Sequence, residues 1–223
     1  VTCQDEVEHW AQRVDSGTLP AGGADFLTAC LRARGLLKSH AHPLGSRAIP
    51  PIRLFISGST APGSRAEIAT AQRRGIPVVG MPPESAGTTA GNRGSLSLDT
   101  WSRQVVAAMN RAPQVVVNIG DVDAPDVEAP ERLSQRLSTL VHRVTEECEP
   151  EHIFAEGGAT ASAIISKMNW KSLEIVREWA PGVVTASVGA SQPQYITMKP
   201  GSYPWLEEFW LAALTVPQGP HTR

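Results

Sequence analysis

The sequence predicts an α/β protein, a three-layer sandwich whose mostly parallel sheet has a mixed edge and carries helices on both faces. Three observations support this. From residue 52 onward, short apolar runs alternate with glycine turns and segments of helical period, as in βαβ units. The run 114–119 is apolar over most of its length, which is typical of a strand covered on both faces. Three short runs crowd into residues 173–199, so we expect hairpins at one edge.

The N-terminal 51 residues predict two helices and a loop. In 3–15 and in 22–35, apolar residues recur every three or four positions, which is the period of an amphipathic helix. The segment 36–51 is rich in proline and is expected to be a loop. It contains His40 and His42, but no third ligand is close in sequence, so no metal site is predicted.

The segment 52–216 is predicted to form the α/β core. Its expected strands are 52–57, 76–80, 114–119, 152–155, 173–176, 183–187 and 195–199. Its expected helices run from 64 to about 74, from 133 to about 149, and through 101–109, 161–168 and 205–214. Residues 83–98 are rich in Gly, Ser and Thr without a period, and predict a long loop. We expect a single domain, 1–223, in which the helices and loop of 1–51 pack on the core.

Composition excludes several classes of function. The net charge is −2 and no stretch is strongly basic, which argues against nucleic acid as a partner. No apolar run approaches the ~20 residues of a membrane span. The acidic start, Val1–Glu6, does not resemble a signal peptide, and the three scattered cysteines indicate reduced thiols. We therefore expect a cytoplasmic protein without a membrane partner.

Two glycine turns are the first candidates for chemistry. Ser57-Gly58-Ser59 and Glu156–Thr160 each follow a predicted strand and open a helix. In an open α/β sheet, ligands bind outside the carboxyl ends of the strands. Glycines there let the backbone approach a phosphate, and the free N–H groups of a helix start favour the anion. The same glycines would also serve simply to end strands and begin helices, so both interpretations stay open.

Neither turn has the spacing of a well-known nucleotide motif. Gly58 and Gly63 are spaced as in a P-loop, but Ser64 stands where that motif needs Lys, and Arg65 where it needs Ser or Thr. The GxGxxG dinucleotide fingerprint is also absent. The ordinary P-loop ATPase and dehydrogenase classes are therefore excluded.

A third element begins at the end of the last predicted strand. Lys199 is placed to neutralise phosphate charge, and Gly201 to permit close backbone approach. Tyr203 or Trp205 would face an adenine. Proline and glycine are also common turn residues, and Trp205 suits a core position, so the residue types leave this element undecided.

Five segments in the same order resemble the C-terminal nucleotide-binding domain of the four-carbon acid sugar kinases, the family of threonate and erythronate kinases. They are Ala21–Asp25 (AGGAD), Ile56–Pro62 (ISGSTAP), Gly157–Ser162 (GGATAS), Ala180–Val183 (APGV) and Lys199–Tyr203 (KPGSY). The resemblance covers most of the chain. It implies that ATP, accompanied by Mg²⁺, contacts Ser59, Gly157, Gly158, Ala159, Thr160 and Gly201. It also implies that the phosphoryl group is directed toward a separate sugar-binding domain or subunit.

Departures from the family pattern bear on activity. Ala159 stands where the family has Asp or Glu, and Glu156, just before the glycines, is the nearest substitute. The N-terminal sugar-binding domain is not found in the sequence, and no catalytic residue is assigned. We expect an ATP-binding domain that transfers phosphate to a sugar-acid hydroxyl only with a partner or the missing domain. The alternative is a non-catalytic nucleotide sensor, or a degenerate remnant that binds another protein.

Overall fold

The structure is a computed structural model that describes residues 4–36, 53–83, 92–120, 129–180, 182–188, 194–201 and 203–211. The chain divides into two compact units, Val1–Ser46 and Arg47–Arg223, which are described separately. The expected packing of the N-terminal helices on the α/β core, as one domain, stays a prediction. His40, His42 and Cys3 lie outside the described residues.

The N-terminal unit contains helices α1 (Gln4–Gln12) and α2 (Ala24–Ala33), close to the predicted segments. The two helices pack through a small core of Ala11, Ala29 and Cys30. A Cβ on Gly22 would lie 2.6 Å from Cδ1 of Phe26, so the ring of Phe26 needs a glycine there.

The larger unit is built on a seven-stranded sheet of order β2-β3-β1-β4-β7-β6-β5. The strands are β1 (Arg53–Ser57), β2 (Val78–Gly80), β3 (Gln114–Asn118), β4 (His152–Glu156), β5 (Glu174–Ala180), β6 (Val183–Val188) and β7 (Gln194–Lys199). The pairs β2–β3, β3–β1, β1–β4 and β4–β7 are parallel, whereas β7–β6 and β6–β5 are antiparallel. The predicted α/β class and its hairpin edge are confirmed.

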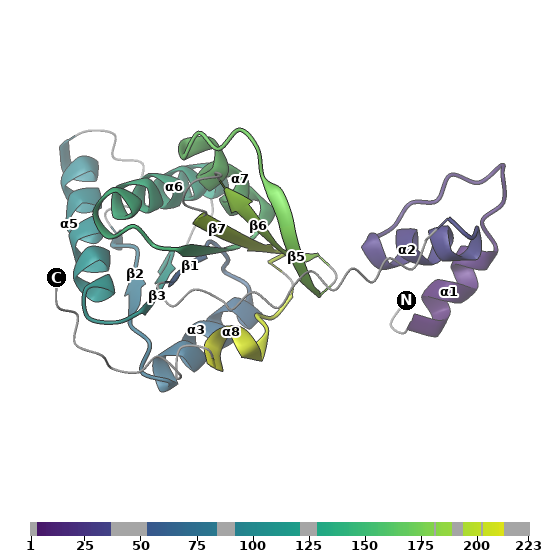
Figure 1. Cartoon of the computed structure of the whole chain (residues 1–223), viewed down its shortest axis with the longest axis horizontal. Helices are drawn as coiled ribbons and strands as arrows, with labels where there is room; N and C mark the ends of the chain where they lie inside the picture. Colours follow the sequence, from purple (N-terminus) through teal and green to yellow (C-terminus); the bar gives the residue numbers. More distant parts are fainter. Residues whose placement is uncertain are drawn as a thin grey trace. The chain divides into compact units, whose positions relative to one another are not determined.

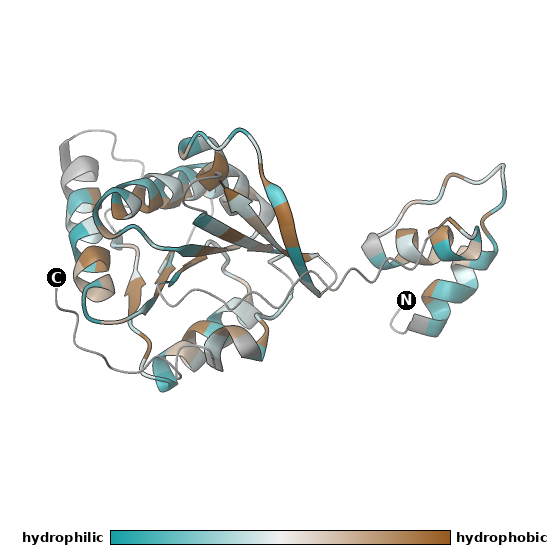
Figure 2. Ribbon diagram, in the orientation of Figure 1, coloured by the Kyte–Doolittle hydropathy of each residue, from teal (hydrophilic) through white to brown (hydrophobic). Residues whose placement is uncertain are grey.

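Helices cover both faces of this sheet (Figure 1). One face packs against α5 (Asn92–Met109), α6 (Ala129–Cys148) and α7 (Gly158–Lys167), and the other against α3 (Pro62–Arg73) and α8 (Glu207–Leu211). Figure 2 shows hydrophilic and hydrophobic residues alternating along α6, as expected of a helix with one buried side. None of the described helices is both long and apolar enough to cross a membrane.

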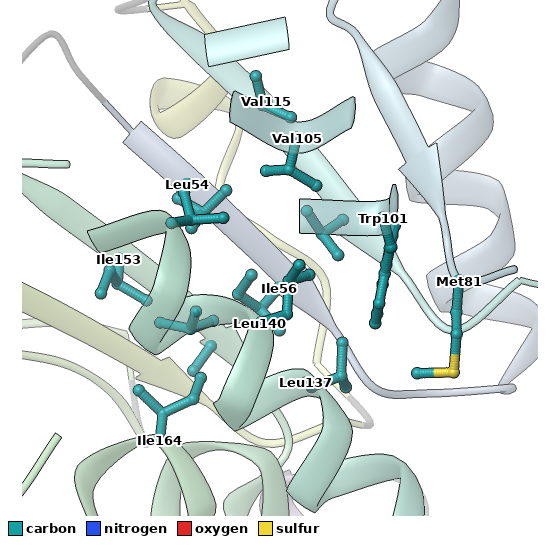
Figure 3. Close-up of a cluster of buried hydrophobic side chains, with 14 of the residues drawn as sticks. Leu54, Ile56, Met81, Trp101, Val105, Val115, Leu137, Leu140, Ile153 and Ile164 are labelled. Carbon is teal, nitrogen blue, oxygen red and sulfur yellow. The ribbon is translucent and has the colours of Figure 1, made fainter. Parts of the chain in front are cut away.

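Successive residues of the central strands point to opposite layers. Leu54 and Ile56 of β1 join side chains from α5, α6 and α7, and Figure 3 shows this cluster with Trp101, Leu140 and Ile164. Phe55, between them, packs on the other face with Phe154 and residues of α3 and α8. Burial on both faces explains why these strands are apolar runs without alternation.

The expected loop over 83–98 is wrong for its second half. Helix α5 already begins at Asn92, while residues 84–91 lie outside the described part. Leu98 is buried in the same cluster as Trp101 and Val105. Tertiary packing of this apolar side therefore extends the helix through residues whose own helix propensity is low.

Candidate functional site

The three predicted turns meet at one edge of the sheet. Ser57, Glu156 and Lys199 are the last residues of β1, β4 and β7, and the strand pairing places them side by side in one row. Because these strands are parallel neighbours, the segments that follow them start from the same edge. The backbones after β4 and β7 are also hydrogen-bonded, since the N–H of Gly157 donates to the carbonyl of Lys199 at 2.9 Å.

A buried ion pair lies at the centre of this row. Nζ of Lys199 is 2.8 Å from Oε1 of Glu156, and the two residues are only 3% and 2% exposed. Two hydroxyls complete the carboxylate's surroundings: Ser57 donates to Oε2 at 2.7 Å and Ser64 to Oε1 at 2.5 Å. The carboxylate thus collects donors from β1, from the first turn of α3 and from β7.

Lys199 also holds the segment that follows it. Its ammonium group donates to the carbonyl of Tyr203 at 2.5 Å and to that of Pro200 at 3.4 Å. Both charges are therefore used inside the protein. The interpretation that Lys199 neutralises phosphate directly, and that Glu156 replaces the family's carboxylate, is corrected: the two side chains neutralise each other beneath the turns.

The turn after β1 faces the turn after β7. Ser59 accepts the N–H of Ala61 on its Oγ at 3.1 Å, and α3 begins at Pro62, where proline suits a helix start. A Cβ built on Gly201 would lie 4.0 Å from that same Oγ. The structure thus brings Ser59 and Gly201, predicted separately, next to each other.

The turn after β4 presents a helix start. Gly157 has φ +93°, a conformation that favours glycine, and α7 begins at Gly158. The first N–H that bonds within the helix is that of Ala161, to the carbonyl of Gly157. The N–H groups of Gly158, Ala159 and Thr160 belong to the first turn, whose donors have no partner in the helix. Gly158 and Ala159 are exposed, and no described atom beyond its chain neighbours and own helix backbone lies within 4 Å of a Cβ built on Gly158.

Thr160 links this turn to the one after β1. A Cβ on Gly58 would lie 2.3 Å from Oγ1 of Thr160 and 3.2 Å from Cδ1 of Leu137. Gly58 is therefore the residue that lets the threonine side chain pack over β1. Since Thr160 is buried, its side chain joins the two turns while its neighbours Gly158 and Ala159 face outward.

The fourth motif packs on the third. Gly182, in the turn between β5 and β6, has φ +78°, and a Cβ there would lie 3.3 Å from Cγ of Pro200 and 3.8 Å from Cε2 of Tyr203. Four of the five resembling segments thus lie around one sheet edge. The fifth, which includes Gly22, belongs to the N-terminal unit.

The two aromatic residues suggested to face an adenine, Tyr203 and Trp205, lie in different environments. Tyr203 is 39% exposed, whereas Trp205 is 7% exposed and sits edge-on to Phe55 and Phe154, with ring centroids 5.7 and 5.6 Å apart. Trp205 is a core residue, and the suggestion that it faces an adenine is corrected. Tyr203 stays available for that role.

Glu67 was missed by sequence reasoning. It lies on α3, and its Oε1 accepts the backbone N–H of Trp205 at 2.7 Å. Burial raises the pKa of this carboxyl to about 7, and the negative charge of Glu156 acts in the same direction. The hydrogen bond from Trp205 and the positive charge of Lys199 lower the pKa and oppose this rise. A signal was present: Ser64, Glu67 and Ala71 follow helical spacing on the inward side of α3, where a carboxylate is unusual.

The polar side chains at the amino edge of the same strands are buried. Arg53 and Gln114 are buried there, and Nη1 of Arg53 and Nε2 of Gln114 each donate to the carbonyl of Phe209 at 3.1 Å. Next to them, burial and the nearby Arg53 lower the pKa of His152 to about 3, so this imidazole is neutral. The described polar groups at this edge serve packing, which leaves the carboxyl edge as the candidate site.

The described side chains do not form a complete metal site of their own. In the part of the chain that the structure describes, no group of three His, Cys, Asp or Glu residues is placed to hold an ion. Glu156 already accepts two hydroxyls and an ammonium group.

Comparison with known families identifies one match. Residues 54–203 match a family described as a nucleotide-binding C-terminal domain. The match begins at β1 and ends at Tyr203, so it contains all three turns of the candidate site. None of the curated proteins matches this chain significantly.

Solved structures share the fold. A domain of unknown function (DUF1537) from Bordetella bronchiseptica, a domain-swapped dimer with bound citrate, is 17% identical with a TM-score of 0.56, covering 96% of this chain and 51% of that one. A Haemophilus influenzae protein of the same DUF1537 family is 18% identical with a TM-score of 0.58, covering 96% of this chain and 52% of that one. The chain thus spans about half the length of these neighbours.

Proposed function

Because this chain belongs to the family of nucleotide-binding C-terminal domains of the four-carbon acid sugar kinases, we propose that it binds an adenine nucleotide at the carboxyl edge of β1, β4 and β7. The observation that carries the proposal is the row Ser57–Glu156–Lys199, which gathers three glycine turns around one open helix start.

The phosphates belong at the first turn of α7. The N–H groups of Gly158, Ala159 and Thr160 would donate to phosphate oxygens, helped by the partial positive charge of the helix start. The open space over Gly158 allows backbone contact with the ligand. On the other side, the hydroxyl of Ser59 and the backbone of Gly201 would close the site. Gly157 would contribute mainly through its φ of +93°, which sets the direction of the helix.

Phosphoryl transfer to a sugar-acid hydroxyl is the reaction that this site would serve in a complete kinase. Such transfer depends mostly on positioning and on electrostatic stabilisation. The described residues place donors for the nucleotide but no group for an acceptor hydroxyl. We therefore assign the acceptor to a second domain or subunit, and Mg²⁺ to the phosphates themselves.

A second candidate function, a nucleotide sensor without catalysis, is favoured by Ala159. This residue occupies the exposed second position of α7, and it brings no carboxylate to the phosphates. An assay of substrate turnover distinguishes the kinase from the sensor. ADP release from ATP that depends on threonate, erythronate or a related acid, measured with a complementing sugar-binding domain, supports the kinase; binding without such turnover supports the sensor.

Nucleotide binding should be visible as thermal stabilisation. With ATP or ADP at about 100 times its dissociation constant, linkage adds about 2.7 kcal/mol to the free energy of unfolding. For a domain of this size, that corresponds to a rise in Tm at about 2–4 °C per kcal/mol. Differential scanning fluorimetry with and without Mg²⁺ measures it. An unchanged Tm at millimolar nucleotide in both conditions contradicts the proposal.

Gly158→Val should remove this stabilisation while leaving the free protein intact. The branched side chain would fill the open space in front of the helix start and keep phosphate from the N–H groups. Positive φ is found at Gly157 and not at Gly158, the first residue of α7, so little backbone strain is expected in the variant.

Ser166→Val provides the matched control, since Ser166 is exposed on the same helix, two turns away. Its Tm shift with ATP should equal that of the parent. A Gly158→Val protein that folds and still gains the parent's full shift would exclude the α7 turn from the site.

A further inference from the structure

The segment between Lys199 and Trp205 is fastened at both ends by buried charged groups. At its start, the ammonium group of Lys199 pairs with Glu156 and holds the carbonyl of Tyr203. At its end, the N–H of Trp205 donates to Oε1 of Glu67, which lies on α3. Gly201, one side of the candidate site, lies between these two attachments. Its position relative to Ser59, at the entrance to α3, therefore depends on Glu67.

Glu67 has an unusual electrostatic environment. Its second oxygen, Oε2, is buried and has no hydrogen-bond partner among the described residues. Glu156 acts on it from β4 and Lys199 from β7, with opposite signs, while Arg74, directly after α3, pairs with Glu207 of α8. A buried carboxylate oxygen without a donor is costly, which favours the protonated acid. Because burial raises the pKa to about 7, both forms of Glu67 are present near neutral pH.

We propose that Glu67 is a positioning residue of the nucleotide site, which holds Gly201 in place through Trp205 and couples phosphate binding to its own protonation. This inference rests on the proposed function. A phosphate at the turns adds negative charge near Lys199, the cation that partly stabilises ionised Glu67. Binding therefore disfavours the carboxylate form, and Glu67 takes up a proton as the nucleotide binds.

The sign of the pH dependence follows from linkage. Below the pKa of the free protein, Glu67 is neutral in both states and the affinity is at its full value. As the pH rises above about 7, the free protein loses its proton first, and the affinity falls until the higher pKa of the complex is passed. One coupled proton limits the loss to about ten-fold per pH unit.

Glu67→Gln tests this, because glutamine keeps the acceptor for Trp205 but cannot ionise. Kd for ADP is measured by calorimetry at pH 6.0, 7.0 and 8.5 for the parent, for Glu67→Gln and for Glu207→Gln, the exposed control on α8. Between pH 6.0 and pH 8.5, the affinity of the parent for ADP should fall by a factor about three to ten times larger than that of Glu67→Gln. The pH dependence of Kd for Glu207→Gln should equal that of the parent. Protonation of ADP itself affects all three proteins alike and therefore does not contribute to the difference between them.

Each possible result supports or contradicts the role of Glu67, the nucleotide site, or both. Equal pH profiles for the parent and Glu67→Gln, with ADP bound by both, overturn the role of Glu67 and leave the nucleotide site standing. Absence of ADP binding at every pH overturns both proposals. If Glu67→Gln does not fold, carbon-13 NMR of the parent's glutamate carboxyls replaces it. One resonance should titrate near pH 7 and move to a higher pH with ADP; a resonance that does not move contradicts the coupling.

Discussion

Replacing Lys199 by Met should destabilise the protein by about 3–5 kcal/mol, because it leaves the carboxylate of Glu156 buried without its cation. Ser57 and Ser64 would still donate hydrogen bonds, but among the described residues no other cation pairs with this carboxylate. The carbonyl of Tyr203 would also lose its donor, and the segment bearing Gly201 would loosen. We therefore expect the nucleotide-induced rise in Tm to disappear. Denaturant unfolding measures the first effect and thermal shift the second.

Two further variants make this result specific to the ion pair. Lys171→Met removes an exposed lysine and should stay within about 0.5 kcal/mol of the parent. Combining Lys199→Met with Glu156→Gln removes both charges, and should recover part of the lost stability since no unpaired charge remains. A single Lys199→Met variant whose unfolding free energy lies within about 1 kcal/mol of the parent would show that the pair does not hold the turns together.

Gly58→Ala should cost about 1–3 kcal/mol, because the added methyl group overlaps Oγ1 of Thr160 and crowds Leu137. Relief requires the β1 turn to move away from the start of α7, so Ser59 and the N–H groups of Gly158 would separate. We expect a lower Tm and a weaker response to ATP together. Both are read from one thermal-shift titration.

Thr160→Ala in the same chain provides the compensating change. Removing Oγ1 clears the space that the new methyl group enters, so the double variant should regain most of the stability and of the ATP response. The coupling between the two sites in a double-mutant cycle should therefore be favourable. Additive effects of Gly58→Ala and Thr160→Ala would mean that the two turns do not bear on each other.

Much of this architecture is encoded locally. The runs 52–57, 114–119 and 152–155 predicted β1, β3 and β4 within one or two residues, since burial on both faces demands continuous apolar strands. The helix expected after Gly157-Gly158 begins at Gly158. The first turns of α5 were missed because their Gly and Ser residues have low helix propensity, and the packing that stabilises them involves the sheet.

Candidate site residues were also recognisable in sequence, but their roles were not. The family resemblance, carried by glycine turns at strand ends, pointed to Ser59, Gly157, Gly158, Ala159, Thr160 and Gly201, and the structure brings these positions to one sheet edge. For Lys199 and Trp205 the residue types leave a ligand contact and a structural role both open, and the structure shows that one forms a buried ion pair and the other packs in the core. Glu67 was not noticed at all.

The sequence by itself determined the strands, the turns and the class of the fold, because apolar periodicity and glycine conformation act over a few neighbouring residues. Only the tertiary structure decided that Ser57, Glu156 and Lys199 form one row, and that Glu67 reaches the chain at Trp205. The longest-range of these contacts, between Glu67 and Trp205, joins residues 138 positions apart. Strand order sets which charges meet, and the exclusion of water by packed elements sets their strength, so neither can be read from local sequence.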